Sequence, residues 1–310
     1  MSNELLNYSE NGIIDEVIVK KYNIESNDKY GSYMLISASE KGNLDMVQIL
    51  IAKGGDVNER DSDGYTPLSS ASVEGHLEIA KILIEEGADI ESTDKNGCTP
   101  LILASIAGHF EVVKFLIEKG ANIESKDKYG TSPLIFVSMS GYLSIVELLI
   151  NNNANIECKN LNGYTPLIYA SLSGHIDIVK LLINNNANID AVNNNGYTPL
   201  TWASMMGHFD IVEEIISRLT LKFISDCPSE YGKKRTSNLF TYDKWNENDS
   251  FMNLSDKFCY SFIEMGSMHE KQIKFSPYTR SLFDKNDLKK MEIIQGLLHF
   301  IKSDSNNAVK

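Results

Sequence analysis

Glycine recurs along this chain of 310 residues at a fixed interval of 33 residues. A second series of glycines follows the first, eleven residues later in each copy. Self-similarity at a period of about 20 to 50 residues is typical of repeat proteins, in which each unit packs against its neighbours. The period therefore constrains the fold more than any other feature. The first series is Gly31, Gly64, Gly97, Gly130, Gly163 and Gly196, and the second is Gly42, Gly75, Gly108, Gly141, Gly174 and Gly207.

Each copy carries signals for two short helices and a turn. Thr66-Pro67 suits the N-cap and the first position of a helix, and Gly75 suits its left-handed C-cap. Apolar residues at helical spacing then predict a second helix over residues 77–85, which Gly87 ends. The extended stretch that follows closes in a turn at Asn96-Gly97. The sequence thus predicts helix, helix and hairpin arm in every period.

The repeated text resembles the ankyrin repeat. Residues 94–109 read Asp-Lys-Asn-Gly-Cys-Thr-Pro-Leu-Ile-Leu-Ala-Ser-Ile-Ala-Gly-His, close to the family pattern D-x-x-G-x-T-P-L-H-x-A-A-x-x-G-H. The histidine after T-P-L is absent from every copy, and serine replaces the second alanine in every full copy. Asn153 and Asn186 replace the glycine after the second helix, where asparagine is the next-best left-handed cap. The resemblance implies an all-α ankyrin-repeat solenoid that binds other proteins.

We expect the ankyrin-repeat domain to cover residues 1–225. It comprises an N-terminal capping repeat at residues 4–30 and repeats that start near residues 31, 64, 97, 130, 163 and 196. The first of these lacks Thr-Pro, and the last keeps a second helix from Phe209 to Arg218 but lacks the usual Gly-Ala-Asp exit. Apolar residues follow Arg218, which indicates that another segment covers them.

The remaining chain resembles no family that we recognise. We expect a linker at residues 226–248, a small helical C-terminal region at residues 249–302 and disorder at residues 303–310. Apolar stripes predict amphipathic helices near residues 250–265 and 287–302. This tail is interpreted as a cap on the last repeat. A separate partner-binding domain and a segment that folds back over the binding groove are the alternatives.

The distribution of charge excludes some partners. The chain has a net charge of −13. Residues 1–217 hold 14 Lys and Arg against 30 Asp and Glu, a net −16, and residues 218–310 hold 15 against 12, a net +3. Nucleic-acid binding needs clustered positive charge, so none is expected in the repeats. We also expect no membrane span and no secretory signal, and the four dispersed cysteines favour a reduced cytoplasmic or nuclear location.

No constellation of residues points to catalysis. His76, His109, His175 and His208 recur at one repeat position, but equivalent positions on stacked helices lie about 8–10 Å apart, too far to share a metal ion. We interpret them as structural hydrogen-bonding residues. Phosphate-binding glycine motifs are absent, and Cys259 with His269 has no supporting motif. We therefore expect no catalytic residues, no cofactor and no metal. The basic run at residues 233–235 suits a loop, with nuclear import as the alternative.

The family resemblance places partner contacts at the hairpin tips and at the exposed end of the first helix. Two rows at the 33-residue period stand out there. Val73, Ile106, Met139, Leu172 and Met205 form a row expected to be exposed, and Leu103, Phe136, Tyr169 and Trp202 form a row expected to be partly core. The candidate partner-binding residues are Tyr65, Tyr129, Met139, Leu161, Tyr164, Leu172, Tyr197, Trp202, Met205 and Met206.

The functional hypothesis is a monomeric, non-enzymatic scaffold or adaptor that binds a partner protein through its concave face. An exposed apolar row suits a helix or an extended peptide, and the acidic framework favours a neutral or basic one. One alternative is a two-part adaptor whose tail recruits a second machine, such as a ubiquitin ligase or a cytoskeletal assembly, or inhibits the groove. The other is an enzyme whose site lies in the C-terminal region.

Overall fold

The computed structural model describes residues 29–225, with side chains for residues 33–219. This described part contains twelve helices and no strand. They belong to two compact units: the first ends at Trp202, and the second begins at Ala203, within α13. The helices are α3 (Lys29–Glu40), α4 (Leu44–Ala52), α5 (Pro67–Glu74), α6 (Leu77–Glu85), α7 (Pro100–Ala107), α8 (Phe110–Glu118), α9 (Pro133–Ser140), α10 (Leu143–Asn151), α11 (Pro166–Ser173), α12 (Ile176–Asn184), α13 (Pro199–Met206) and α14 (Phe209–Ser225).

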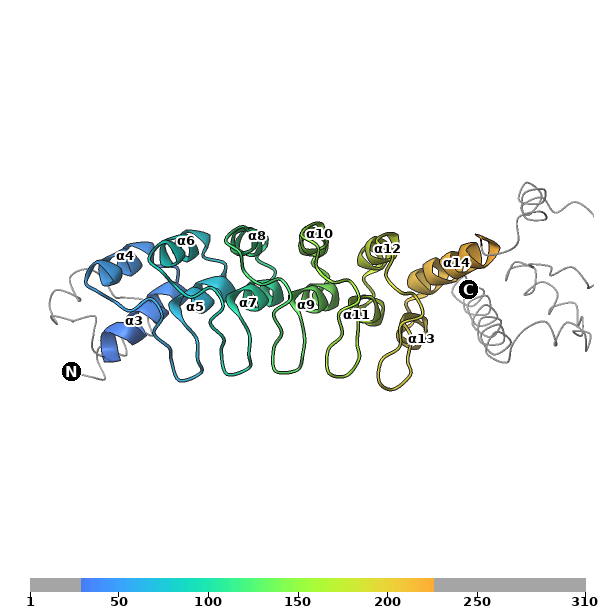
Figure 1. The fold of residues 1–310 in the computed structure, drawn as a ribbon, viewed down its shortest axis with the longest axis horizontal. Helices are drawn as coiled ribbons and strands as arrows, with labels where there is room; N and C mark the ends of the chain where they lie inside the picture. Colours follow the sequence, from blue (N-terminus) through green and yellow to red (C-terminus); the bar gives the residue numbers. More distant parts are fainter. Residues whose placement is uncertain (1–28, 226–310) are drawn as a thin grey trace, which may run out of the picture. The chain divides into compact units, whose positions relative to one another are not determined.

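In the first unit the helices form two rows, as Figure 1 shows. The first helices of the repeats, α3, α5, α7, α9 and α11, make the lower row, and the second helices, α4, α6, α8, α10 and α12, make the upper row. The hairpin arms between successive repeats project from the lower row, away from the second helices (Figure 1). The predicted solenoid of paired helices and arms is therefore confirmed.

The first helix of each repeat has fixed signals at both ends. The Thr66 hydroxyl accepts a hydrogen bond from the backbone N–H of Ser69, whose own hydroxyl accepts from the Thr66 N–H. Pro67 occupies the first helical position, where its missing N–H leaves no bond unmade. Gly75 ends the helix with a left-handed φ of 80°. The predicted N-cap, proline and C-cap of this helix are all confirmed.

The second helix ends in a different kind of cap. In α6 it covers Leu77–Glu85, the range that the sequence predicts, and Gly87 follows with a φ of 89°. After α10 and α12 the same place is taken by Asn153 and Asn186, with φ of 64° and 65°. Asparagine tolerates this conformation better than other residues that carry a side chain. The predicted asparagine caps are confirmed.

Packing between the two rows makes a continuous apolar core. Leu68 of α5 and Leu83 of α6 have no exposed surface, and Ile79 is 2 % exposed. The position of Leu68 is occupied one and two repeats later by Leu101 and Leu134, both 1 % exposed. Burying a side chain of this size contributes about 1.5–3 kcal/mol. Because the core positions recur at the repeat period, every unit depends on its neighbours for burial.

Two sets of side chains lock consecutive repeats together. The imidazole Nε2 of His109 lies 2.9 Å from the carbonyl oxygen of Val73, one repeat earlier, and His76 and His175 make the equivalent contacts. In the segments that follow α6 and α8, a carboxylate oxygen of Glu91 accepts a hydrogen bond from the backbone N–H of Asn122 at 2.7 Å. Glu124 and Glu157 repeat this bond in the next two units. These histidines therefore have the structural role that the sequence predicts.

Both ends of the described part depart from the expected helix lengths. α3 begins at Lys29 and has 12 residues against 8 in the next first helix, because Thr-Pro is absent and nothing fixes a later start. The prediction that the last helix ends at Arg218 was wrong, since α14 continues to Ser225. With no glycine or asparagine cap after it, the helical pattern has no stop signal there.

Several predictions fall outside the described residues. They are the capping repeat at residues 4–30, apart from the start of α3, the basic run at 233–235, and the linker, helical region and disordered end assigned to residues 226–310. The domain boundary at residue 225 also stays a prediction. Within the described helices, none is long and apolar enough to cross a membrane.

Candidate protein-binding surface

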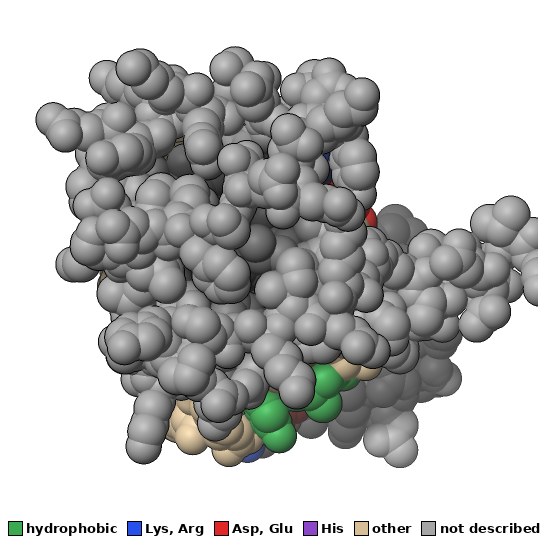
Figure 2. Space-filling view, turned by 90° about the vertical axis from the view of Figure 1, so that its right-hand side faces the viewer, with side chains coloured by type: hydrophobic (Ala, Val, Ile, Leu, Met, Phe, Trp, Pro, Cys, Tyr) green, Lys and Arg blue, Asp and Glu red, His purple; other side chains and the backbone are tan. Residues whose placement is uncertain are grey.

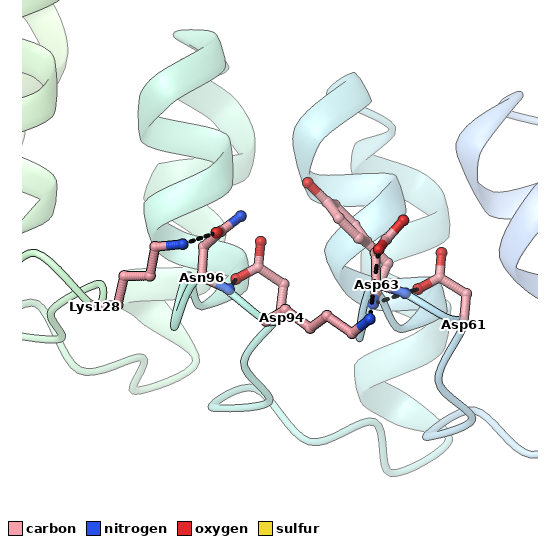
Figure 3. Close-up of polar contacts among 7 residues, drawn as sticks. Asp61, Asp63, Asp94, Asn96 and Lys128 are labelled. Atoms are coloured by element: carbon pink, nitrogen blue, oxygen red, sulfur yellow. Dashed lines mark hydrogen bonds and ion pairs between the residues drawn. The ribbon is translucent and has the colours of Figure 1, made fainter.

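Each hairpin arm is shaped by one side chain at its start. A carboxylate oxygen of Asp61 accepts the backbone N–H groups of Asp63 and Tyr65, both at 2.8 Å (Figure 3). Asp94 binds its own loop in the same way, through Asn96 and Cys98. Hydrogen bonds from the backbone of a loop to a side chain at its start fix the conformation of the turn. The arms are therefore preformed. The equivalent residues in the next three arms are Asp127, Asn160 and Asn193.

Neighbouring arms are also joined by backbone hydrogen bonds. The N–H of Lys95 donates to the Asp63 carbonyl at 2.9 Å, and that of Lys128 donates to Asn96 at 2.7 Å. The series continues from Leu161 to Tyr129 and from Asn194 to Asn162. The Lys128 ammonium adds a 2.7 Å bond to the side-chain oxygen of Asn96 (Figure 3). The arms thus form one row of loops whose backbones are fixed relative to one another.

At one position of the first helix the side chain becomes larger in successive repeats of the first unit. The residues there are Ser70, Leu103, Phe136, Tyr169 and Trp202. Ser70 and Leu103 are buried, whereas Phe136, Tyr169 and Trp202 are partly exposed. This agrees with the expectation that the row is partly core. The last two members contact tyrosines of the hairpin arms: Tyr169 lies against Tyr164, and Trp202 against Tyr164 and Tyr197. The largest of these partly exposed rings therefore lie at the last repeats of the first unit.

At those repeats four rings make a cluster. Tyr164 stacks on Tyr169 with ring centroids 4.8 Å apart, and lies 6.0 Å from Trp202. Tyr197 meets Trp202 edge-on at 5.4 Å. We call Tyr164, Tyr169, Tyr197 and Trp202 the aromatic cluster. Burial raises the pKa of the Tyr169 phenol, and a hydrogen bond from the Asn160 amide to its hydroxyl opposes that rise. Tyrosine and tryptophan are enriched among the residues that carry most of the binding energy at protein interfaces.

The same surface positions are closed in the earlier repeats. Cys98, Ile102 and Leu103 form a buried group, and the partly buried Tyr65 and Phe136 pack against it. Burial, with the carboxylates of Asp94 and Asp127 nearby, raises the pKa of the Cys98 thiol to about 12. The Tyr65 phenol also has a raised pKa, chiefly from burial and then from Asp94. The three buried side chains, Cys98, Ile102 and Leu103, stabilise the stack and present little apolar surface.

Most predicted site residues in the first unit have exposed or partly exposed side chains. Leu161 is 70 % exposed and Tyr129 is 59 % exposed, both at hairpin tips. Figure 2 shows apolar side chains of the described residues along the lower edge, the side to which the arms project in Figure 1. Met139 and Tyr197 are also exposed, and Tyr65, Tyr164, Leu172 and Trp202 are partly buried.

The structure brings together only part of this set. Tyr164, Tyr197 and Trp202 share the aromatic cluster, while Tyr129 and Leu161 are linked through the backbone of adjacent arms. Met205 and Met206 are exposed and belong to the second unit. In the row expected to be exposed, Val73 and Leu172 are partly buried, and Ile106, Met139 and Met205 are exposed.

Sequence reasoning missed two residues of this surface, Asn160 and Asn193. Their side-chain oxygens shape the arms as the aspartates do, but each has an amide nitrogen, a hydrogen-bond donor, in place of the second carboxylate oxygen, an acceptor. Asn160 donates to the Tyr169 hydroxyl at 3.2 Å. The signal in the sequence is the change from aspartate to asparagine at a fixed repeat position.

The histidines and cysteines of the described residues have structural surroundings. Among the described residues, no group of three or more His, Cys, Asp and Glu side chains is arranged to hold a metal ion. His76, His109 and His175 contact backbone carbonyls instead. The Cys158 thiol is buried, with a pKa of about 11 set mainly by burial.

Comparison with known protein families agrees with this architecture. A family model for ankyrin repeats matches three times, over residues 5–94, 87–160 and 134–223. No curated protein gives a significant match to the chain. Ankyrin repeats are in general modules of protein–protein interaction. The helices, the arms and the family match lead to one conclusion: this chain belongs to the ankyrin-repeat family.

Proposed function

We propose that this protein is a non-enzymatic scaffold or adaptor that binds a partner protein through the hairpin arms and first helices of its last repeats. The observation that carries this proposal is the aromatic cluster, whose member Tyr197 is exposed, together with the exposed hairpin tip at Leu161. Exposed apolar groups held on a rigid frame suit association, because their burial contributes free energy at small entropic cost.

The chemistry of the surface suggests the nature of the partner. The first three arms begin with carboxylates, at Asp61, Asp94 and Asp127, whereas the next two begin with the neutral amides Asn160 and Asn193. Combined with a chain charge of −13, this favours a neutral or basic partner. A helix or extended segment would place apolar side chains on the aromatic cluster and any basic residues toward the earlier arms.

Affinity capture with the full chain tests this proposal. The double variant Leu161→Ala with Tyr197→Ala removes two exposed side chains from the arms, so its thermal melting curve is expected to match that of the wild type. The matched control, Lys114→Ala with Glu147→Ala, removes two exposed side chains from the second helices α8 and α10. Both variants and the wild type are used as baits in native lysate.

The proposal expects the arm variant to lose a specific set of captured proteins that the control variant retains. Removal of two contact residues of this size should weaken capture by about tenfold or more. Equal capture by the arm variant and the wild type would contradict a partner site at this surface.

A further inference from the structure

The last hairpin arm and first helix of the first unit contain two buried hydrogen-bond donors that have no acceptor among the described residues. They are the side-chain amide nitrogen of Asn193 and the indole nitrogen of Trp202. Neither makes a hydrogen bond within the part of the chain that the structure describes. Asn193 is 4 % exposed, so water does not readily replace the missing partner. An unsatisfied buried donor is costly, and two at one place call for an explanation.

The preceding repeat offers the equivalent contact for comparison. Asn160 accepts the backbone N–H groups of residues 162 and 164 at 3.1 and 3.0 Å, and its amide nitrogen donates to the Tyr169 hydroxyl. Asn193 accepts the equivalent N–H groups of residues 195 and 197 at 3.0 and 2.9 Å. Its oxygen is therefore committed, and by equivalence with Asn160 we infer that its nitrogen is directed toward Trp202, which occupies the position of Tyr169 one repeat later. An indole donates but has no acceptor atom.

From this donor pair we infer that Asn193 and Trp202 form a subsite for a hydrogen-bond acceptor carried by the partner, a backbone carbonyl of an extended segment. This inference rests on the proposed function, because it names the chemistry of the partner at the same surface. A neutral carbonyl fits better than a carboxylate, since the chain carries a net charge of −13. The rings around the pair would accept the apolar side chains on either side of that carbonyl.

Access to the pair requires one small movement. Tyr197 lies edge-on against Trp202, and it is the exposed member of the cluster at 38 %. A rotation about its χ1 angle moves the ring away without any change in the helices. The carbonyl then replaces the edge of the tyrosine ring and accepts from both donors.

The earlier repeats of the chain suggest a substitution that would fill the subsite. Asp61, Asp94 and Asp127 shape their arms with a carboxylate at the position of Asn193. Asn193→Asp is therefore expected to fold normally, while its second carboxylate oxygen accepts the Trp202 N–H and fills the subsite from within. The matched control is Asn160→Asp, one repeat earlier, where the amide already has a partner in Tyr169.

Proton NMR of the full chain provides the test, because only two tryptophans contribute indole N–H signals. Trp202→Phe assigns them, and Trp245 serves as the internal reference. The probe is N-acetyl-leucine methylamide, which carries two neutral carbonyls beside an apolar side chain. We expect a saturable downfield shift of the Trp202 signal alone. The apparent affinity should fall about tenfold in Asn193→Asp and stay unchanged in Asn160→Asp.

Three results would overturn the inference. They are no saturable shift of Trp202, an equal response in Asn193→Asp, and a response to the carboxylate probe N-acetyl-leucine without one to the methylamide. The proposed function fails by a different result, since it requires only that the arm variant loses captured proteins. If capture depends on Leu161 and Tyr197 but the methylamide leaves Trp202 unmoved, the partner site stands and the carbonyl subsite does not.

Discussion

The imidazole Nε2 of His109 lies 2.9 Å from the backbone carbonyl oxygen of Val73, 36 residues earlier in the chain. The ring also covers Gly75, where an added Cβ would lie 2.5 Å from the His109 Nδ1 atom. One side chain therefore closes the end of the preceding first helix and satisfies its carbonyl. The same contact joins Gly42 to His76 and Gly141 to His175, whereas the Tyr142 ring takes the place of histidine against Gly108.

Replacing His109 should weaken the stack more than its partial exposure suggests. In His109→Ala the Val73 carbonyl loses its partner and the ring leaves Gly75 uncovered. We expect a loss of about 1–3 kcal/mol, measured as a lower urea midpoint. Lys114→Ala, at an exposed position of the following helix, should change stability by less than about 0.5 kcal/mol. A result for His109→Ala as small as this control would contradict the account.

The two classes of cap glycine should differ in their tolerance of alanine. Gly75 and Gly87 have φ of 80° and 89°, so alanine is strained at both. At Gly75 the new methyl group also meets His109, whereas at Gly87 nothing lies within 4 Å. We expect Gly87→Ala to cost about 1 kcal/mol and Gly75→Ala about 1–3 kcal/mol more. Urea denaturation of both variants checks this, and equal losses would argue against the contact.

Removal of a buried serine hydroxyl should stabilise the protein at one repeat and not at another. The Ser138 hydroxyl is buried without a hydrogen-bond partner among the described residues, whereas the Ser72 hydroxyl donates to the Leu68 carbonyl at 2.7 Å. Alanine gains about 0.5 kcal/mol of helix propensity at each position. Ser138→Ala should therefore stabilise by about 1 kcal/mol, and Ser72→Ala should not, since it loses a bond. Comparison of urea midpoints decides the point; equal gains would contradict it.

The buried thiols should make the fold sensitive to alkaline pH. The pKa of Cys98 is raised to about 12 and that of Cys158 to about 11, above the value of 9.0 for a free thiol. Well below pH 9 the thiols are protonated in both the folded and the unfolded state, and the shifts change nothing. As the pH rises from 9 toward 12, the unfolded chain loses protons first, so the free energy of unfolding falls. Cys98→Ala should flatten this fall relative to the wild type when denaturation is followed against pH. An unchanged slope would show that Cys98 does not titrate as described.

Much of the fold could be predicted from the sequence because local signals repeat in register. Thr66-Pro67 and Gly75 fix the ends of a helix by backbone chemistry alone, and the structure confirms them. The signals failed where they were absent: no cap follows Arg218, and α14 runs on to Ser225. Asn153 and Asn186 were predictable as left-handed caps. The reason that asparagine replaces glycine only there needs the structure, which shows open space around Gly87 and the His109 ring against Gly75.

The candidate surface was less accessible to sequence reasoning. The 33-residue rows identify Tyr164, Tyr197 and Trp202 as neighbours of one face, but ring contacts depend on rotamers that a pattern does not encode. The donors at Asn193 and Trp202 become visible only when every other bond of the arm has been assigned. A change from aspartate to asparagine looks small in the sequence. In the structure it replaces a carboxylate oxygen, which accepts hydrogen bonds, with an amide nitrogen, which donates them.

The central claim is that a partner protein contacts the arms of the last repeats. Site-specific photo-cross-linking in the full chain tests it most directly, with p-benzoylphenylalanine placed at Tyr197 in one sample and at Lys114 of α8 in another. The account predicts a cross-linked partner from position 197 and none from position 114. A partner captured from position 114 but not from position 197 would contradict it.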